Sequence, residues 1–177
     1  SSGPDRILVF ERGGETRILR RNLDRFVVAS HGVEDITIDG NGGADSIVTR
    51  NLDAVADLGV LSLYGGTGGD RLDARRIGDT PVHLNGQQGN DEIFGGSGDD
   101  TLEGENGFDF IVGGAGNDVI DGGAAGDRIS GQSGDDSIEG GSGNDLIFGG
   151  RGDDTISGSS GRDFIFAGAG NDYVMGG

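Results

Sequence analysis

The chain has 177 residues, which is enough for one ordinary domain or a short repeat array. Its 40 glycines do not recur at every third position, which excludes a collagen-like triple helix, and the lack of cysteine excludes disulfides and thiolate metal sites. The formal net charge of −18 predicts no nucleic-acid partner, and no apolar run approaches the roughly 20 residues that span a bilayer, so we expect no membrane insertion.

Residues 1–39 carry short apolar stretches that predict β strands. The stretch ILVFERGGETRIL at 7–19 is typical of a β-hairpin that turns at Gly13-Gly14, and RFVVAS at 25–30 predicts a further strand. Since the terminal repeats of a stacked array need covering, we expect residues 1–39 to form a hairpin-like cap at the N-terminal end of such a stack.

Residues 40–85 contain two copies of a nine-residue unit, in which Gly-Gly-x-Gly-x-Asp precedes an aliphatic residue flanked by two free positions. The copies are GNGGADSIV at 40–48 and GGTGGDRLD at 65–73. They begin 25 and 21 residues before the next matching unit, whereas two adjoining units span 18 residues. We therefore expect residues 40–85 to form longer, irregular coils with insertions.

Residues 86–177 hold ten of these units in succession, followed by a final Gly-Gly. Position 6 is aspartate and position 8 is aliphatic in all ten, and we call a unit odd or even by its number counted from Gly86. The odd units carry Asp91, Asp109, Asp127, Asp145 and Asp163, and the even units carry Asp100, Asp118, Asp136, Asp154 and Asp172.

This pattern predicts an all-β fold. Positions 7–9 form a short strand whose position 8 points inward, and the glycine-rich segment forms a turn. Two turns and two strands close one 18-residue coil, and successive coils stack about 4.8 Å apart. We expect a parallel β-roll, or β-solenoid, that forms one continuous domain with odd turns stacked along one edge and even turns along the other.

Stacked carboxylates repel each other unless a cation lies between them. Calcium fits best, because it takes six to eight oxygen ligands and glycine-rich turns free backbone carbonyls to join the carboxylates. Magnesium demands stricter geometry, and zinc lacks ligands because the ten units contain neither histidine nor cysteine. A unit with one aliphatic core residue and several glycines is not stable alone, so we expect ion binding and folding to be one process.

The ten units resemble the RTX, or haemolysin-type, calcium-binding nonapeptide repeat. The resemblance implies calcium between turns on the same edge, held by the position-6 aspartates and by carbonyls of turn glycines. It extends to Asp45 and Asp70 in the longer coils, which gives about ten ions. The glycines implied as carbonyl ligands are Gly96, Gly98, Gly114, Gly116, Gly141, Gly143, Gly150 and Gly152. The resemblance also implies a bacterial protein that is exported unfolded by type I secretion and folds outside the cell or at its surface.

Two departures from the repeat affect the expected sites. Ala125 and Glu105 stand where the repeat has glycine, and a non-glycine residue forced to positive φ costs about 1–2 kcal/mol, so we expect weaker sites beside them. We also expect Arg75 and Arg76, in the second irregular loop, to cover the end of the even aspartate column.

The outward positions of the odd units form an apolar ridge, which predicts a contact with another domain or subunit. Its members are Phe94, Phe110, Val112, Leu146, Phe148, Phe164 and Phe166. No unit combines a nucleophile with a histidine base, so we expect no enzymatic activity in this chain. The first hypothesis is a calcium-binding module of a larger secreted protein. The alternatives are an adhesin or surface-layer segment that assembles with calcium, and the C-terminal part of a secreted hydrolase or epimerase.

Overall fold

The computed structural model describes residues 6–11, 16–20, 23–29, 35–50 and 60–177, and every regular element within them is a β strand. The larger sheet, which we call the odd sheet, has the order β19 (Phe164–Ala169), β16 (Leu146–Arg151), β13 (Arg128–Ser133), β11 (Phe110–Ala115), β9 (Glu92–Phe94), β7 (Arg71–Asp73), β5 (Ser46–Arg50), β1 (Arg6–Glu11), β2 (Thr16–Arg20) and β3 (Leu23–Ala29). The even sheet has the order β20 (Tyr173–Met175), β17 (Thr155–Ser157), β14 (Ser137–Glu139), β12 (Val119–Asp121), β10 (Thr101–Glu103), β8 (Val82–Gln88), β6 (Val60–Thr67) and β4 (Asp35–Asp39). A small third sheet pairs β15 (Ser142–Gly143) with β18 (Ser160–Gly161).

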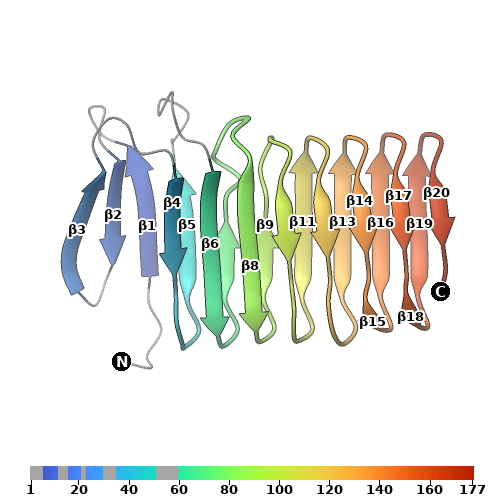
Figure 1. The fold of residues 1–177 in the computed structure, drawn as a ribbon, viewed down its shortest axis with the longest axis horizontal. Helices are drawn as coiled ribbons and strands as arrows, with labels where there is room; N and C mark the ends of the chain where they lie inside the picture. The colour runs from blue at the N-terminus through green and yellow to red at the C-terminus, as the bar shows by residue number, and fades with distance from the viewer. Residues whose placement is uncertain (1–5, 12–15, 21–22, 30–34, 51–59) are drawn as a thin grey trace.

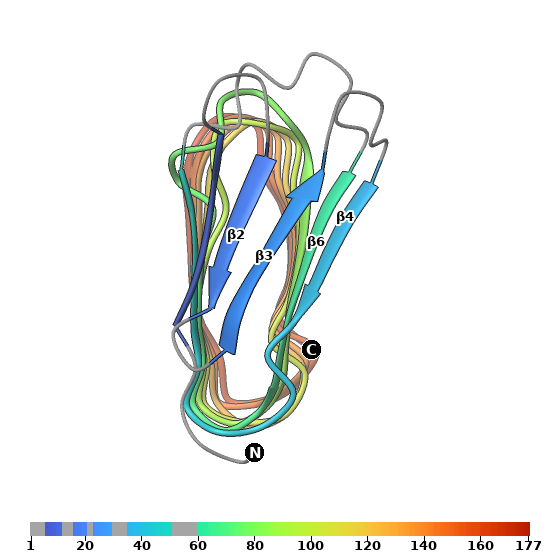
Figure 2. The ribbon, with the colours of Figure 1, turned by 90° about the vertical axis from the view of Figure 1, so that its left-hand side faces the viewer.

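The chain winds as a parallel β-roll, as the repeat predicts. Within the roll, neighbouring parallel strands of a sheet are one coil apart, so Ile129 pairs with Ile147 in the odd sheet and Leu102 with Ile120 in the even sheet. The longer coils keep the same pairing despite their insertions, because Leu72 lies opposite Ile93. Figure 1 shows the strands side by side along the long axis, and Figure 2 shows the two layers joined by turns at both edges.

The core is a single layer of aliphatic side chains between the two sheets. The position-8 residues from Ile93 to Ile156 are at most 2% exposed, and one row comes from each sheet. Ile165 is only partly buried and Val174 is 44% exposed, because no later coil covers them in the described structure. Each coil is therefore stabilised by only two core side chains and by its neighbours.

The predicted hairpin is present at the N-terminal end. β1 pairs antiparallel with β2, and β2 with β3, while β1 also pairs in parallel with β5. The first strand of the hairpin is thus itself part of the roll. Figure 2, viewed along the roll from its N-terminal end, shows β2 and β3 crossing in front of the space between the two layers, as expected of a cap. Gly13, Gly14 and Ser30 lie outside the described residues.

Apart from β9, which has three residues, the strands of the odd regular units are longer than the three residues that the repeat predicts. β11, β13, β16 and β19 each have six residues, because the parallel register continues into the following turn and pairs Gly114 with Gln132. The even strands β10, β12, β14, β17 and β20 have three residues each, as predicted. The turns therefore take part in sheet hydrogen bonding instead of only joining strands.

Candidate metal sites along the two turn columns

The position-6 aspartates stack in two columns, one along each edge of the roll. In each column the backbone N–H of one aspartate donates to Oδ1 of the aspartate one coil later. The N–Oδ1 distance is 2.8 Å from Asp109 to Asp127 in the odd column and 2.9 Å from Asp100 to Asp118 in the even column. The odd column continues into the longer coils, because Asp45 N–H donates to Asp70 and Asp70 N–H donates to Asp91. The same bond joins the pairs Asp91–Asp109, Asp118–Asp136, Asp127–Asp145, Asp136–Asp154, Asp145–Asp163 and Asp154–Asp172. The structure thus brings together every pair of aspartates that the sequence places in one gap between turns.

The second carboxylate oxygen of most column aspartates is buried without a partner. These residues are at most 3% exposed from Asp70 to Asp154, and their Oδ2 atoms accept no hydrogen bond except at Asp100. The unpartnered Oδ2 atoms belong to Asp70, Asp91, Asp109, Asp118, Asp127, Asp136, Asp145, Asp154 and Asp163. Burying a carboxylate oxygen without a compensating interaction is costly, so each gap favours a bound cation.

The raised pKa values of the column carboxyls also indicate that a positive charge in the gaps would stabilise them. Burial, together with a smaller contribution from the stacked carboxylates, raises the pKa of Asp118 to about 8 and that of Asp91 and Asp127 to about 7. The backbone N–H from the preceding coil lowers them only in part. A divalent ion in the gap would restore the ionised form, because an adjacent positive charge stabilises a carboxylate.

Backbone carbonyls of the turn glycines lie between successive turns, beside the aspartate gaps. The carbonyls of Gly96 and Gly98 point at the α-carbons of Gly114 and Gly116 in the next coil, so closely that a methyl group there would collide with them. The same holds for the carbonyls of Gly116, Gly143, Gly150 and Gly152, while those of Gly114 and Gly141 accept hydrogen bonds from the next coil. All eight glycines that the sequence implies as ligands therefore direct their carbonyls toward the following turn.

This donor set fits calcium better than a transition metal. Among the described residues no group of three or more His, Cys, Asp or Glu side chains is arranged to hold a metal ion. Each gap instead combines two aspartates with backbone carbonyls, which are the hard oxygen ligands that calcium takes in flexible geometry. The aspartates and carbonyls of the turns would hold the ion, and the ion would supply the charge that the buried Oδ2 atoms lack.

Non-glycine residues at the glycine positions take the strained backbone that the sequence predicts. Glu105 has a φ of 72° and Ala125 a φ of 83°, and Gln87, Gln132 and Ser159 also have positive φ. These values lie in the left-handed region that L side chains disfavour. The turn geometry is thus imposed by the stack even where the local residue opposes it.

The even column begins differently from the way the sequence predicts. Val82 occupies the position before Asp100 in the column, so Asp100 Oδ1 accepts from Val82 N–H at 3.0 Å and Oδ2 from Gly96 N–H at 2.7 Å. Backbone carbonyls of Ala74 and Ile77, not arginine side chains, lie against Gly96. The expectation that Arg75 and Arg76 cover this end is wrong. Arg75 instead pairs with Asp73 at 2.6 Å, and both arginines line a surface hollow beside Asp73.

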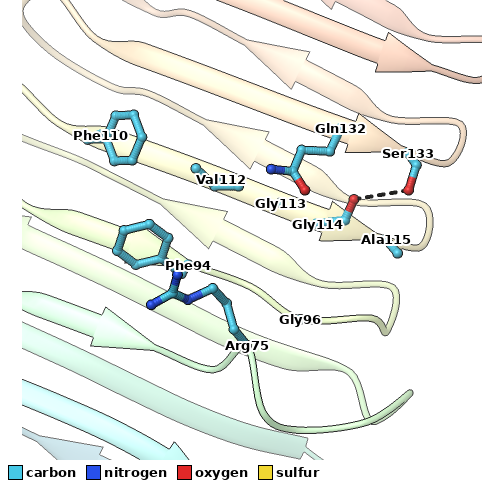
Figure 3. Close-up of a pocket in the computed structure, with 10 residues that line it drawn as sticks. All are labelled: Arg75, Phe94, Gly96, Phe110, Val112, Gly113, Gly114, Ala115, Gln132 and Ser133. Atoms are coloured by element: carbon cyan, nitrogen blue, oxygen red, sulfur yellow. Dashed lines mark hydrogen bonds between the residues drawn. The ribbon is translucent and has the colours of Figure 1, made fainter.

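The apolar ridge is also only partly as predicted. Phe94 is 9% exposed, because the guanidinium groups of Arg71 and Arg75 each lie 4.4 Å from its ring centre, so it does not belong to an open contact surface. Figure 3 shows Arg75 beside the Phe94 ring. Further along the ridge, Phe148 and Phe166 stack with ring centres 5.1 Å apart, and Phe164 and Phe166 are each 56% exposed. Arg71 belongs to the unit at 65–73, whereas Arg75 belongs to the irregular loop that follows it, whose placement the repeat pattern does not specify.

Comparisons with known proteins agree with this geometry. The family model of the RTX calcium-binding nonapeptide repeat matches residues 83–111, 94–129, 103–138, 121–156 and 148–177, which together make up more than half of the chain. Searches of curated proteins and of solved structures found no match. The described residues contain no helix long and apolar enough to cross a membrane. With its two columns of stacked aspartates and its repeat sequence, the chain belongs to the RTX calcium-binding repeat family.

Proposed function

We propose that this chain is a non-catalytic calcium-binding module of a larger secreted bacterial protein, and that it folds when it meets calcium outside the cell. The observation that carries the proposal is the series of buried Oδ2 atoms without a hydrogen-bond partner, which runs from Asp70 to Asp163 in the odd column and from Asp118 to Asp154 in the even column. Without a cation these carboxyls must be protonated or the coil must open. The free energy of calcium binding therefore contributes directly to the free energy of folding. Export in an unfolded state is what the family resemblance implies.

We infer about ten ions from the geometry of the columns. The odd column has six gaps from Asp45 to Asp163, and the even column has four gaps from Asp100 to Asp172. The space before Asp100 is not counted, because both of its carboxylate oxygens already accept N–H groups and Val82 brings no carboxylate. The two columns are therefore unequal in length.

Circular dichroism during a calcium titration of the chain tests coupled folding. We expect little β structure in EGTA, a cooperative gain as calcium is added, and about ten bound ions by equilibrium dialysis. Asp118→Asn should raise the calcium midpoint, whereas Asp121→Asn, three residues later on the exposed outer surface, should leave it nearly unchanged. A chain that already has full β structure in EGTA would contradict the proposal.

The exposed end of the ridge supports a second role as a contact surface. The stacked pair Phe148 and Phe166, with Phe164 beside them, leaves apolar surface open to solvent. Light scattering with and without calcium separates the possibilities: monomers in calcium support the first role, and large ordered assemblies support an adhesin or surface-layer segment. Replacing Phe148 and Phe166 with serine should abolish such assemblies if this surface forms them. If the parent is instead a hydrolase or epimerase, its catalytic motif lies outside these residues.

A further inference from the structure

We infer that the turn at residues 122–127 is the weak point of the odd column, so that calcium fills the two gaps on either side of Asp127 last. The inference rests on the proposed calcium-coupled folding and concerns its order along the roll. Three features of this turn support the inference: a second ladder of hydrogen bonds is missing, residues that would offer carbonyl oxygens to the ion have a strained backbone, and a positively charged side chain lies next to the turn.

The even edge has a second ladder of hydrogen bonds that the odd edge lacks at this turn. The position-5 side chains of the even units accept from the position-5 N–H one coil later, as Asn117 N–H donates to Asp99 Oδ1 at 2.7 Å and Asp135 N–H to Asn117 Oδ1 at 2.8 Å. The ladder continues unbroken through Asp153 and Asn171. It therefore bridges all four even gaps, before any ion is considered.

On the odd edge the same ladder is interrupted around Asp127. Phe108 N–H donates to Asn90 Oδ1, and Arg162 N–H donates to Asn144 Oδ1, each at 3.0 Å. Phe108 and Gly126 stand at the two intervening places, and neither side chain offers an oxygen acceptor. The Asp109–Asp127 and Asp127–Asp145 gaps are thus held by the aspartate bond without the second bond.

Each of these two gaps also takes a carbonyl from a strained residue. The Glu105 carbonyl lies against Gly123 across the first gap, where it also accepts from Ala124 N–H at 2.7 Å, and the Ala125 carbonyl lies against Gly143 across the second. Glu105 and Ala125 have positive φ, a conformation that L side chains disfavour. Presenting these two oxygens to an ion therefore opposes the local backbone preference, which glycine at 141 and 143 in the following odd turn does not. Gln132 in the even column shares the positive φ of Glu105, so the strain that distinguishes turn 122–127 is that of Ala125, the one non-glycine residue at position 4 among the ten regular units.

A positive charge adjoins the same turn. Arg128 follows Asp127 directly, and it is the only basic residue at position 7 among the ten regular units. Its guanidinium carbon is held over the outer surface of the odd sheet, 5.9 Å from the ring centre of Phe110 and 5.6 Å from that of Phe148. Since calcium affinity follows ligand charge and site rigidity, all three features lower affinity at these gaps. We expect their calcium midpoint to lie about threefold to tenfold above that of the even column.

Hydrogen exchange measured by mass spectrometry at stepped calcium concentrations tests the order of filling. In the unmodified chain, peptides that cover 122–130 should gain protection at higher calcium than peptides that cover 113–121. The double substitution Ala125→Gly with Gly126→Asn gives turn 122–127 the same six residues as turn 113–118. It restores the glycine and the side-chain acceptor of the Asp127–Asp145 gap, but leaves Phe108, Glu105 and Arg128 in place, so it should shorten the delay of peptides that cover 122–130. The exchange Gly116→Ala with Asn117→Gly does the reverse in the even column, and should delay protection there.

Coinciding midpoints in the unmodified chain would overturn the inference, and so would a double variant at 125 and 126 whose delay is as long as that of the unmodified chain. If that variant fails to fold, the reciprocal pair at 116 and 117 still decides, because an undelayed even turn would contradict the inference. Protection of every segment in calcium-free buffer would instead refute coupled folding itself. The two ideas can therefore fail separately.

Discussion

The thickness of the core leads to a quantitative prediction for Ile120→Ala. Ile120 is 1% exposed and is one of only two core side chains in its coil, while Val119, its neighbour in β12, is 54% exposed on the outer surface. Truncating a buried isoleucine to alanine costs about 2–5 kcal/mol, and an exposed substitution typically changes stability by less than about 0.5 kcal/mol. Ile120→Ala and Val119→Ala thus form a matched pair that differs chiefly in burial.

The effect on calcium binding follows from linkage. If about ten ions bind in one cooperative transition, a loss of about 3 kcal/mol is shared among them and raises the calcium midpoint by only about 1.7-fold. If a single ion controlled folding, the same loss would raise the midpoint more than about a hundredfold. A calcium titration followed by circular dichroism measures this factor directly. Equal midpoints for Ile120→Ala and Val119→Ala would refute the view that a single layer of aliphatic side chains holds the coils together.

Three other outcomes are expected. Burial raises the pKa of Asp118 from 3.8 to about 8, so the calcium-free roll is most stable at low pH and loses this stability as the pH rises through the pKa of the folded state. Circular dichroism in calcium-free buffer should therefore show more β structure at pH 5 than at pH 8. Gly149→Ala should destabilise the calcium-bound roll by about 1–3 kcal/mol in thermal melts, because its methyl group would meet Asp154 Oδ2 and the Ala167 carbonyl, whereas Gly176→Ala should be nearly neutral because no atom lies within 4 Å. Arg75→Ala should expose Phe94 and leave Asp73 with fewer positive neighbours, which raises the pKa of Asp73 from its lowered value and costs about 1 kcal/mol; an unchanged melting temperature together with an unchanged Asp73 titration in NMR would argue against this.

The periodic features of the molecule could be predicted from the sequence, and the aperiodic ones could not. A period of 18 residues fixes which residues face each other, so the buried row that includes Ile129 and Ile147 and the stacked pairs such as Asp118–Asp136 follow from counting. The covering of Phe94 by Arg75 depends on how an irregular loop folds back onto the sheet, and no local pattern specifies that. The different start of the even column has one visible signal, the valine at 82 where the column would need an aspartate.

The irregular loop at 74–81 helps to fix which coil pairs with which, a choice that the near-identical repeats leave open. A coil that slipped by 18 residues would again find an aspartate N–H opposite an aspartate Oδ1, and an aliphatic side chain opposite an aliphatic one, so the repeats distinguish poorly between the correct pairing and one displaced by a whole coil. Asp100 breaks this symmetry, because its partners are Val82 N–H and Gly96 N–H, and Ile77 and Ala74 fill the space before it. Together with the longer coils and the hairpin strand β1, this non-repeating contact fixes the register of the later coils.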